Sequence, residues 1–138
     1  MGLKVTPDRS FESLPEVNAI LVPGGDVSMI SKNQQVLNWL KQQYHEVSNV
    51  LSVCTGSDIV AKSGLLNGLS ATTFHKNLDN LAIEFPEITV LNNKRFVDNG
   101  KIITSAGLSS GIDAALHLVS KVKGVESAKT VAMHIEYD

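Results

Sequence analysis

Residues 50–56 read Val-Leu-Ser-Val-Cys-Thr-Gly, a short apolar run that ends at a cysteine and a glycine. A similar run, Ala19-Ile20-Leu21-Val22, ends at Pro23-Gly24-Gly25. Short runs rich in β-branched residues are typical of strands that are buried on both faces of a parallel sheet. The segment between them carries apolar residues at helical spacing, namely Ile30, Leu37, Leu40, Tyr44 and Val47. These runs predict a strand, a helix and a second parallel strand.

The rest of the chain predicts four more helices and one hairpin. The helices are expected at residues 57–63, 76–84, 109–123 and 125–134, and Gly64, Pro86 and Gly124 mark where the first three stop. Asn99-Gly100 between two apolar runs is a strong hairpin signal. We therefore expect one α/β domain over residues 1–138, with a flavodoxin-like open parallel sheet, flanking helices and an inserted β-hairpin.

Ligands of open parallel sheets bind at the carboxyl ends of the strands. Gly24, Gly25, Cys54, Ala106 and Gly107 are all expected at that edge of the sheet. These residues are therefore the first candidates for a functional site.

Composition and charge argue against several classes of function, among them nucleic-acid binding and membrane association. Hydrophobic residues make up 43% of the chain, and the formal net charge of -2 provides no strong field for nucleic acid or an anionic membrane. The first residues show no signal peptide or membrane span, so a cytoplasmic protein is expected. A single cysteine closes no internal disulfide, and no histidine lies nearby at ligand spacing, so we expect neither a metal nor a cofactor.

Cys54 is the main chemical candidate. Ser52 and Gly56, two places before and after it, are small, as a sharp strand-to-helix turn requires. Helix-start amides favour the thiolate, and the N–H groups of Thr55 and of Gly24-Gly25 are candidate oxyanion donors. The alternatives are that Cys54 is a small buried hydrophobe and that Pro-Gly-Gly is only a turn.

The histidines provide one weaker candidate. His75 follows Ala71-Thr72-Thr73 and is expected near the same sheet edge, as a base, a substrate contact or a residue without a catalytic role. His117 lies four residues after Asp113, which predicts an exposed pair on one helix.

With these residues in place, the chain resembles the ThiJ/PfpI superfamily, which shares the fold of the class I glutamine amidotransferases. Within it the sequence looks most like isocyanide hydratases and the amidotransferase-like domains of AraC-type regulators. The motifs that carry the resemblance are Ile20-Leu21-Val22-Pro23-Gly24-Gly25, Val53-Cys54-Thr55-Gly56-Ser57, Gly64-Leu65-Leu66-Asn67-Gly68, Ala71-Thr72-Thr73, Arg95-Phe96-Val97-Asp98-Asn99-Gly100, Thr104-Ser105-Ala106-Gly107 and Gly111-Ile112-Asp113-Ala114-Ala115-Leu116.

The resemblance implies that Cys54 is a nucleophile and that the backbone of Gly25 and Thr55 forms an oxyanion site. It implies an enzyme that adds the cysteine to a small electrophile such as an isocyanide, an aldehyde or an amide. Thr55 stands where peptidase members carry histidine, which favours the hydratase-like branch. In that branch histidine often follows the second threonine, but here Phe74 does, with His75 one place later.

The resemblance also predicts a shortened amino-terminal part. Family domains begin with a strand, a helix and a second strand before the segment that matches Leu3, and the acid that contacts the cysteine lies there. We therefore expect a truncated sheet, weak catalysis, and a homodimer that covers the unpaired edge. The alternative function is a non-enzymatic ligand-binding or regulatory domain, and a degenerate fragment is a third possibility. No room remains after Asp138 for a helix-turn-helix pair, so no nucleic acid is expected to bind.

Overall fold

The computed structural model describes residues 2–137 as an alternation of strands and helices. The elements, in order, are β1 (Ala19–Val22), a 3-10 helix (Ile30–Lys32), α1 (Gln34–Glu46), β2 (Asn49–Val53), α2 (Gly56–Lys62), β3 (Ser70–Ala71), a second 3-10 helix (His75–Asn77), α3 (Leu78–Glu84), β4 (Thr89–Val90), β5 (Phe96–Asp98), β6 (Ile102–Ser105), α4 (Ser110–Lys123) and α5 (Val125–His134).

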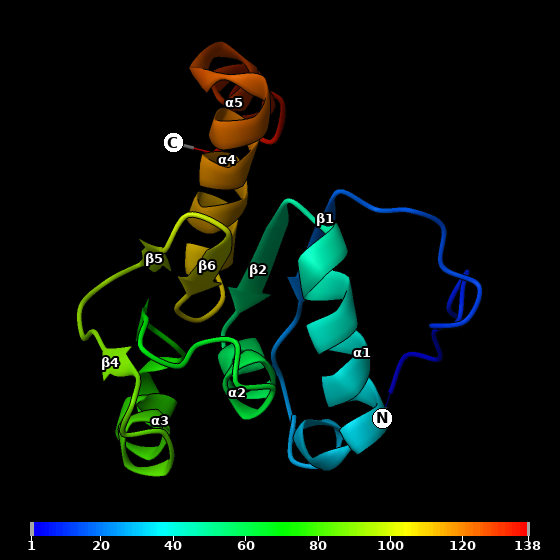
Figure 1. The fold of residues 1–138 in the computed structure, drawn as a ribbon. Helices are drawn as coiled ribbons and strands as arrows, with labels where there is room; N and C mark the ends of the chain where they lie inside the picture. The colour runs from blue at the N-terminus through cyan, green and yellow to red at the C-terminus, as the bar shows by residue number, and fades with distance from the viewer. Residues whose placement is uncertain (1, 138) are drawn as a thin grey trace.

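The main sheet has the strand order β1-β2-β6-β5, and its first three strands are parallel (Figure 1). In this register Leu21 pairs with Leu51, and Leu51 pairs with Ile103. Strands β3 and β4 form a separate two-stranded parallel sheet that the sequence did not predict. The mostly parallel sheet with flanking helices confirms the predicted fold class.

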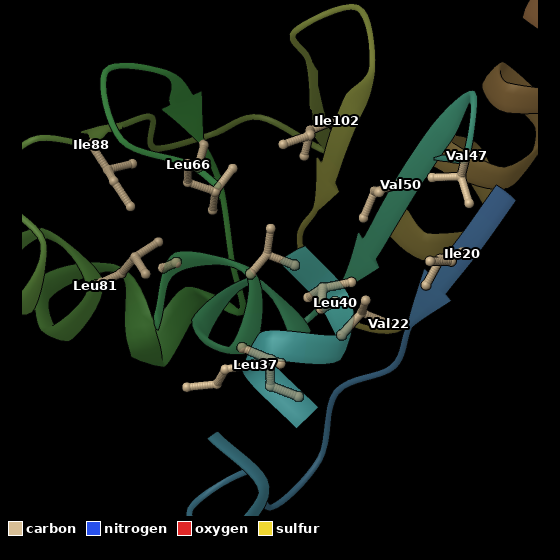
Figure 2. Packing of buried hydrophobic residues seen from close by; sticks show 14 residues of the cluster. Ile20, Val22, Leu37, Leu40, Val47, Val50, Leu66, Leu81, Ile88 and Ile102 are labelled. Carbon is tan, nitrogen blue, oxygen red and sulfur yellow. The ribbon is translucent and has the colours of Figure 1, made fainter. Parts of the chain in front are cut away.

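Helices pack on both faces of the main sheet. On one face α1 and α2 cover a large core that includes Val50 and Ile102, and Figure 2 shows these side chains between the strands and the helices. On the other face α4 covers a smaller cluster of Leu51, Ile103 and Ala114. Successive residues of a strand point to opposite faces, so Val50 and Leu51 of β2 serve different cores. Burial on both faces explains why the apolar residues Val50 and Leu51 are adjacent in β2 instead of alternating with polar ones.

The predicted turns and helix ends are confirmed where glycine takes a left-handed conformation. Strands β5 and β6 form the antiparallel hairpin, and Gly100 in its turn has a φ of 87°. Helix α2 stops just before Gly64, with a φ of 78°, and α4 stops before Gly124, with a φ of 90°. Glycine adopts such angles without the steric cost that a Cβ brings.

Two details differ from the sequence prediction. Strand β1 is an edge strand that is buried on one face only, and Leu21 on its other face is 57% exposed. Helix α1 begins at Gln34 rather than near Ile30, because the Asn33 side chain accepts hydrogen bonds from the first helical amides at Gln35 and Val36.

Helix α4 is fastened to the hairpin by a polar cluster around Asp98. The Asp98 carboxylate lies 2.7 Å from His117 Nε2 and 2.9 Å from Lys121 Nζ. Burial opposes ionisation of Asp98, but the bonds from His117, Lys121 and the Gly100 amide outweigh it and lower its pKa. The predicted pairing of His117 with Asp113 is therefore wrong. Asp113 instead pairs with Arg95, because the hairpin brings Arg95, directly before β5, next to α4.

No helix within residues 2–137 combines the length and the apolar character that crossing a membrane requires.

Candidate active site

Cys54 lies in the short turn between the end of β2 and the start of α2. Its φ is 58°, a left-handed conformation that a residue with a side chain rarely adopts. Its amide donates to the carbonyl oxygens of Ser105 (3.1 Å), the last residue of β6, and of Ala106 (3.3 Å), which follows it. The thiol residue is half-buried. The neighbouring strand therefore holds the backbone of Cys54 in its unusual conformation.

Two hydroxyl groups fix the carbonyl group of Cys54. Thr73 Oγ1 donates to the Cys54 oxygen at 3.0 Å, and Ser57 Oγ donates to it at 3.1 Å. Thr73 and Ser57 are both fully buried. Buried hydroxyl groups that lose a partner are costly, so these bonds resist any rotation of the peptide that follows Cys54.

Glycines provide the space around this turn. A Cβ on Gly24 would lie 2.7 Å from Cys54 Cβ and 2.8 Å from the Thr55 nitrogen. A Cβ on Gly56 would collide with the carbonyl oxygen of Val22. The turn after β1 and the turn after β2 are therefore in direct backbone contact, which only glycine permits at these two positions.

Of the two predicted oxyanion donors in the described residues, the Gly25 amide already donates a hydrogen bond and the Thr55 amide does not. The Gly25 amide donates to Thr55 Oγ1 at 2.9 Å, and the Thr55 hydroxyl donates back to the Gly25 carbonyl at 2.8 Å. The Thr55 amide makes no hydrogen bond within the described part of the chain. Thr55 thus closes the two turns on each other with its side chain and leaves its own N–H available next to the thiol residue.

Phe74 and Gly107 border the thiol. A Cβ on Gly107 would lie 2.7 Å from Phe74 Cδ2 and 3.8 Å from Cys54 Sγ. Ala106 is tied to the sheet, because its amide donates to the Arg95 carbonyl at 2.9 Å. The predicted residues Cys54, Ala106 and Gly107 are therefore close together, and Phe74 joins them.

His75 lies beside Phe74 and is not hydrogen-bonded to Cys54 in the described part of the chain. It is exposed, and its ring centroid lies 4.3 Å from that of Phe74 in an edge-on arrangement. Its catalytic role stays a prediction, and the aromatic residue beside the thiol is Phe74.

Sequence reasoning did not identify the residues that brace the site. Thr73, Phe74, Asp58 and Asn77 all act on the Cys54 turn, directly or through one neighbour. Their signal was weak, because only the tertiary fold brings residues 72–77 next to the turn. Among residues 2–137, no group of three histidine, cysteine or acidic side chains gathers in a way that could hold a metal ion.

Comparison with known proteins places this architecture in a family. The DJ-1/PfpI family model matches residues 1–121. This chain belongs to the DJ-1/PfpI family. The isonitrile hydratase of Pseudomonas putida is 36% identical to it over 99% of this chain and 59% of the relative. The HTH-type transcriptional regulator GbdR of Pseudomonas aeruginosa is 27% identical over 99% of this chain and 37% of the regulator.

Solved structures of DJ-1/PfpI proteins share the fold. A ThiJ/PfpI family protein from Pseudomonas syringae superimposes with a TM-score of 0.88 at 29% identity, over 99% of this chain and 57% of that protein. Drosophila melanogaster DJ-1beta gives a TM-score of 0.86 at 21% identity, over 99% of this chain and 74% of that protein. The chain thus spans 59% of the hydratase and 37% of the regulator that it matches.

Proposed function

We propose that this DJ-1/PfpI chain is a cysteine-dependent enzyme of the hydratase or hydrolase type, with Cys54 as its nucleophile. The observation that carries the proposal is the left-handed backbone of Cys54 at the junction of β2 and α2. Strained conformations of this kind are found at active sites, where the surrounding structure maintains them. Here hydrogen bonds to both the amide and the carbonyl of Cys54 maintain it.

The substrate class we propose is a small electrophile, with an isonitrile first, because the chain is 36% identical to an isonitrile hydratase. The Cys54 sulfur would form a bond to the isonitrile carbon, and that carbon would take up a proton. Water would then add, the carbon–sulfur bond would break, and a formamide would leave with the thiol restored. Such covalent catalysis divides one difficult addition into two easier steps.

Backbone amides would stabilise the charge that develops on the substrate. The Thr55 N–H is available for this role, whereas the Gly25 N–H would first have to leave Thr55 Oγ1. We therefore assign the principal donor role to Thr55 and a secondary role to Gly25. Ala106 and Gly107 would line the site beside Cys54. These steps require no metal or cofactor.

A second candidate function is a ligand-binding regulatory domain. It is favoured by the 27% identity to the GbdR regulator over nearly the whole of this chain. In that case a small molecule would bind beside Cys54 without being converted. A homodimer and a cytoplasmic location remain part of the proposal for either function.

The test is hydration of an isonitrile by the purified 138-residue chain. We expect only slow product formation, in line with the weak catalysis expected of the shortened domain. Cys54→Ala should abolish it, and His75→Gln should change it by less than about tenfold, because an essential general base would cost 10²–10⁴-fold. His75→Gln is also the matched control for a change beside the site. Tight binding of the isonitrile without turnover would favour the regulatory function, and turnover that survives Cys54→Ala would contradict the proposal.

A further inference from the structure

The chain on either side of Phe74 is tied to the Cys54 turn. On one side, the Thr73 hydroxyl donates to the Cys54 carbonyl at 3.0 Å. On the other side, Asn77 Nδ2 donates to the two carboxylate oxygens of Asp58 at 2.7 and 3.0 Å. Asp58 lies in the first turn of α2, four residues after Cys54. Phe74 is therefore held between two anchors that both lead back to the same turn.

The link between Asp58 and Asn77 is well suited to an anchor. Asp58 is half-buried, and this burial raises the pKa of its carboxyl group while the Asn77 hydrogen bond opposes the rise. A hydrogen bond to a charged acceptor is stronger than one between neutral groups. The Asn77 backbone N–H also donates to the Phe74 carbonyl at 2.7 Å. One turn of backbone therefore connects the side-chain bond of Asn77 to Phe74.

The Phe74 ring is the part of this segment that borders the thiol. A single point beside Gly107, where its Cβ would stand, lies 2.7 Å from the ring and 3.8 Å from Cys54 Sγ. A bulky group that approaches the sulfur from this side meets the ring. Movement of Phe74 would widen this approach, and the two anchors oppose such movement.

We propose that Asp58 and Asn77 are positioning residues that hold the Phe74 ring beside Cys54, and that the ring limits the size of the molecules that reach the thiol. The proposal rests on the proposed function in one respect, since it takes Cys54 as the group that meets the substrate. It assigns to Phe74 a role in selecting substrates by size.

Alkylation of Cys54 by two reagents tests the proposal without any turnover. Iodoacetamide and iodoacetanilide present the same reacting carbon, and in both the sulfur–carbon bond forms, iodide leaves and the thiol proton passes to the buffer. The second reagent carries an additional phenyl ring. The measured quantity is the ratio of the two rates, divided by the same ratio for N-acetylcysteine. In the parent chain we expect this ratio to disfavour iodoacetanilide.

Phe74→Ala and Asn77→Ala should each shift the ratio toward iodoacetanilide by about tenfold, the factor that corresponds to about 1.4 kcal/mol. In the double variant the two shifts should not add, because both act through one ring. Exchange of the pair, Asp58→Asn with Asn77→Asp, restores a donor and a carboxylate and should return the ratio to the parent value. Asp79→Ala, on the exposed side of α3, is the matched control and should leave the ratio unchanged.

Circular dichroism identifies any variant that fails to fold, and the exchanged pair then supplies the decisive comparison. An unchanged ratio in folded Asn77→Ala, additive shifts in the double variant, or an exchanged pair that behaves like Asn77→Ala would each overturn the proposal. Because alkylation needs no catalysis, these outcomes are independent of whether the chain hydrates an isonitrile.

Discussion

Cys54 holds a left-handed backbone conformation that costs about 1–3 kcal/mol for a residue with a side chain. The structure compensates through the close contact of Gly24 and Gly56 with neighbouring backbone and through bonds to the peptide groups of Cys54. At the scale of single residues, the site therefore depends on Gly24 and Gly56, which allow the two turns to be in contact, as well as on the Cys54 sulfur.

Gly56→Ala separates backbone contact from helix propensity. Alanine favours a helix over glycine by about 1 kcal/mol, so propensity alone predicts that this change in α2 stabilises the protein. The new Cβ would collide with the Val22 carbonyl, and overpacking typically costs about 1–3 kcal/mol. We expect the contact to dominate, because backbone cannot move aside as a side chain can.

Urea unfolding measures the result. Gly56→Ala should lower the free energy of unfolding by about 1 kcal/mol or more relative to the parent. Gly2→Ala is the control, because a Cβ there meets nothing within 4 Å. An alanine variant at position 56 that is as stable as the parent would show that the two turns are not in firm contact.

At the scale of elements, local signals predicted most helices and the hairpin. Asn99-Gly100 and Gly124 mark turns whose backbone angles only glycine adopts easily, so the sequence was informative there. The apolar residues at helical spacing include Ile30, but α1 begins only at Gln34, because the Asn33 side chain caps the helix there. At this position the Asn33 cap, rather than the spacing of apolar residues, determines where the helix begins.

Contacts between elements were predictable only in part. The chain order placed Cys54 and Gly107 at one end of the sheet, because parallel strands end at the same edge. Asp98 with His117 and Arg95 with Asp113 were not predicted, since each pair joins the hairpin to α4 across a distance that sequence spacing does not reveal. Phe74 was noted only as the residue in place of a family histidine, and its position beside the thiol was not predicted for the same reason.

At the scale of the whole molecule, the edge of the main sheet formed by β1 is the surface best suited to association with a second copy. Strand β1 lies at that edge, its run of four residues carries no charge, and Leu21 is 57% exposed. Unpaired edges and exposed apolar residues favour association. We expect a homodimer in solution, and Leu21→Lys should shift it toward the monomer because a charge opposes burial of this face.

Light scattering at several concentrations measures the mass of each form. Ile83→Lys is the control, because Ile83 is equally apolar and 80% exposed but lies on α3, away from this edge. A monomer at high concentration, or equal effects of the two lysine variants, would argue against association through β1.

The central claim is that Cys54 is an accessible nucleophile kept reactive by the turn between β2 and α2. The most direct measurement is the rate of Cys54 alkylation by iodoacetamide at neutral pH, in the folded chain and in the chain unfolded by urea, with N-acetylcysteine under both conditions. We predict that folded Cys54 reacts about tenfold faster than the model thiol and that unfolding removes the difference, because the helix start and its amides are lost. A folded chain that reacts no faster than N-acetylcysteine would contradict the account.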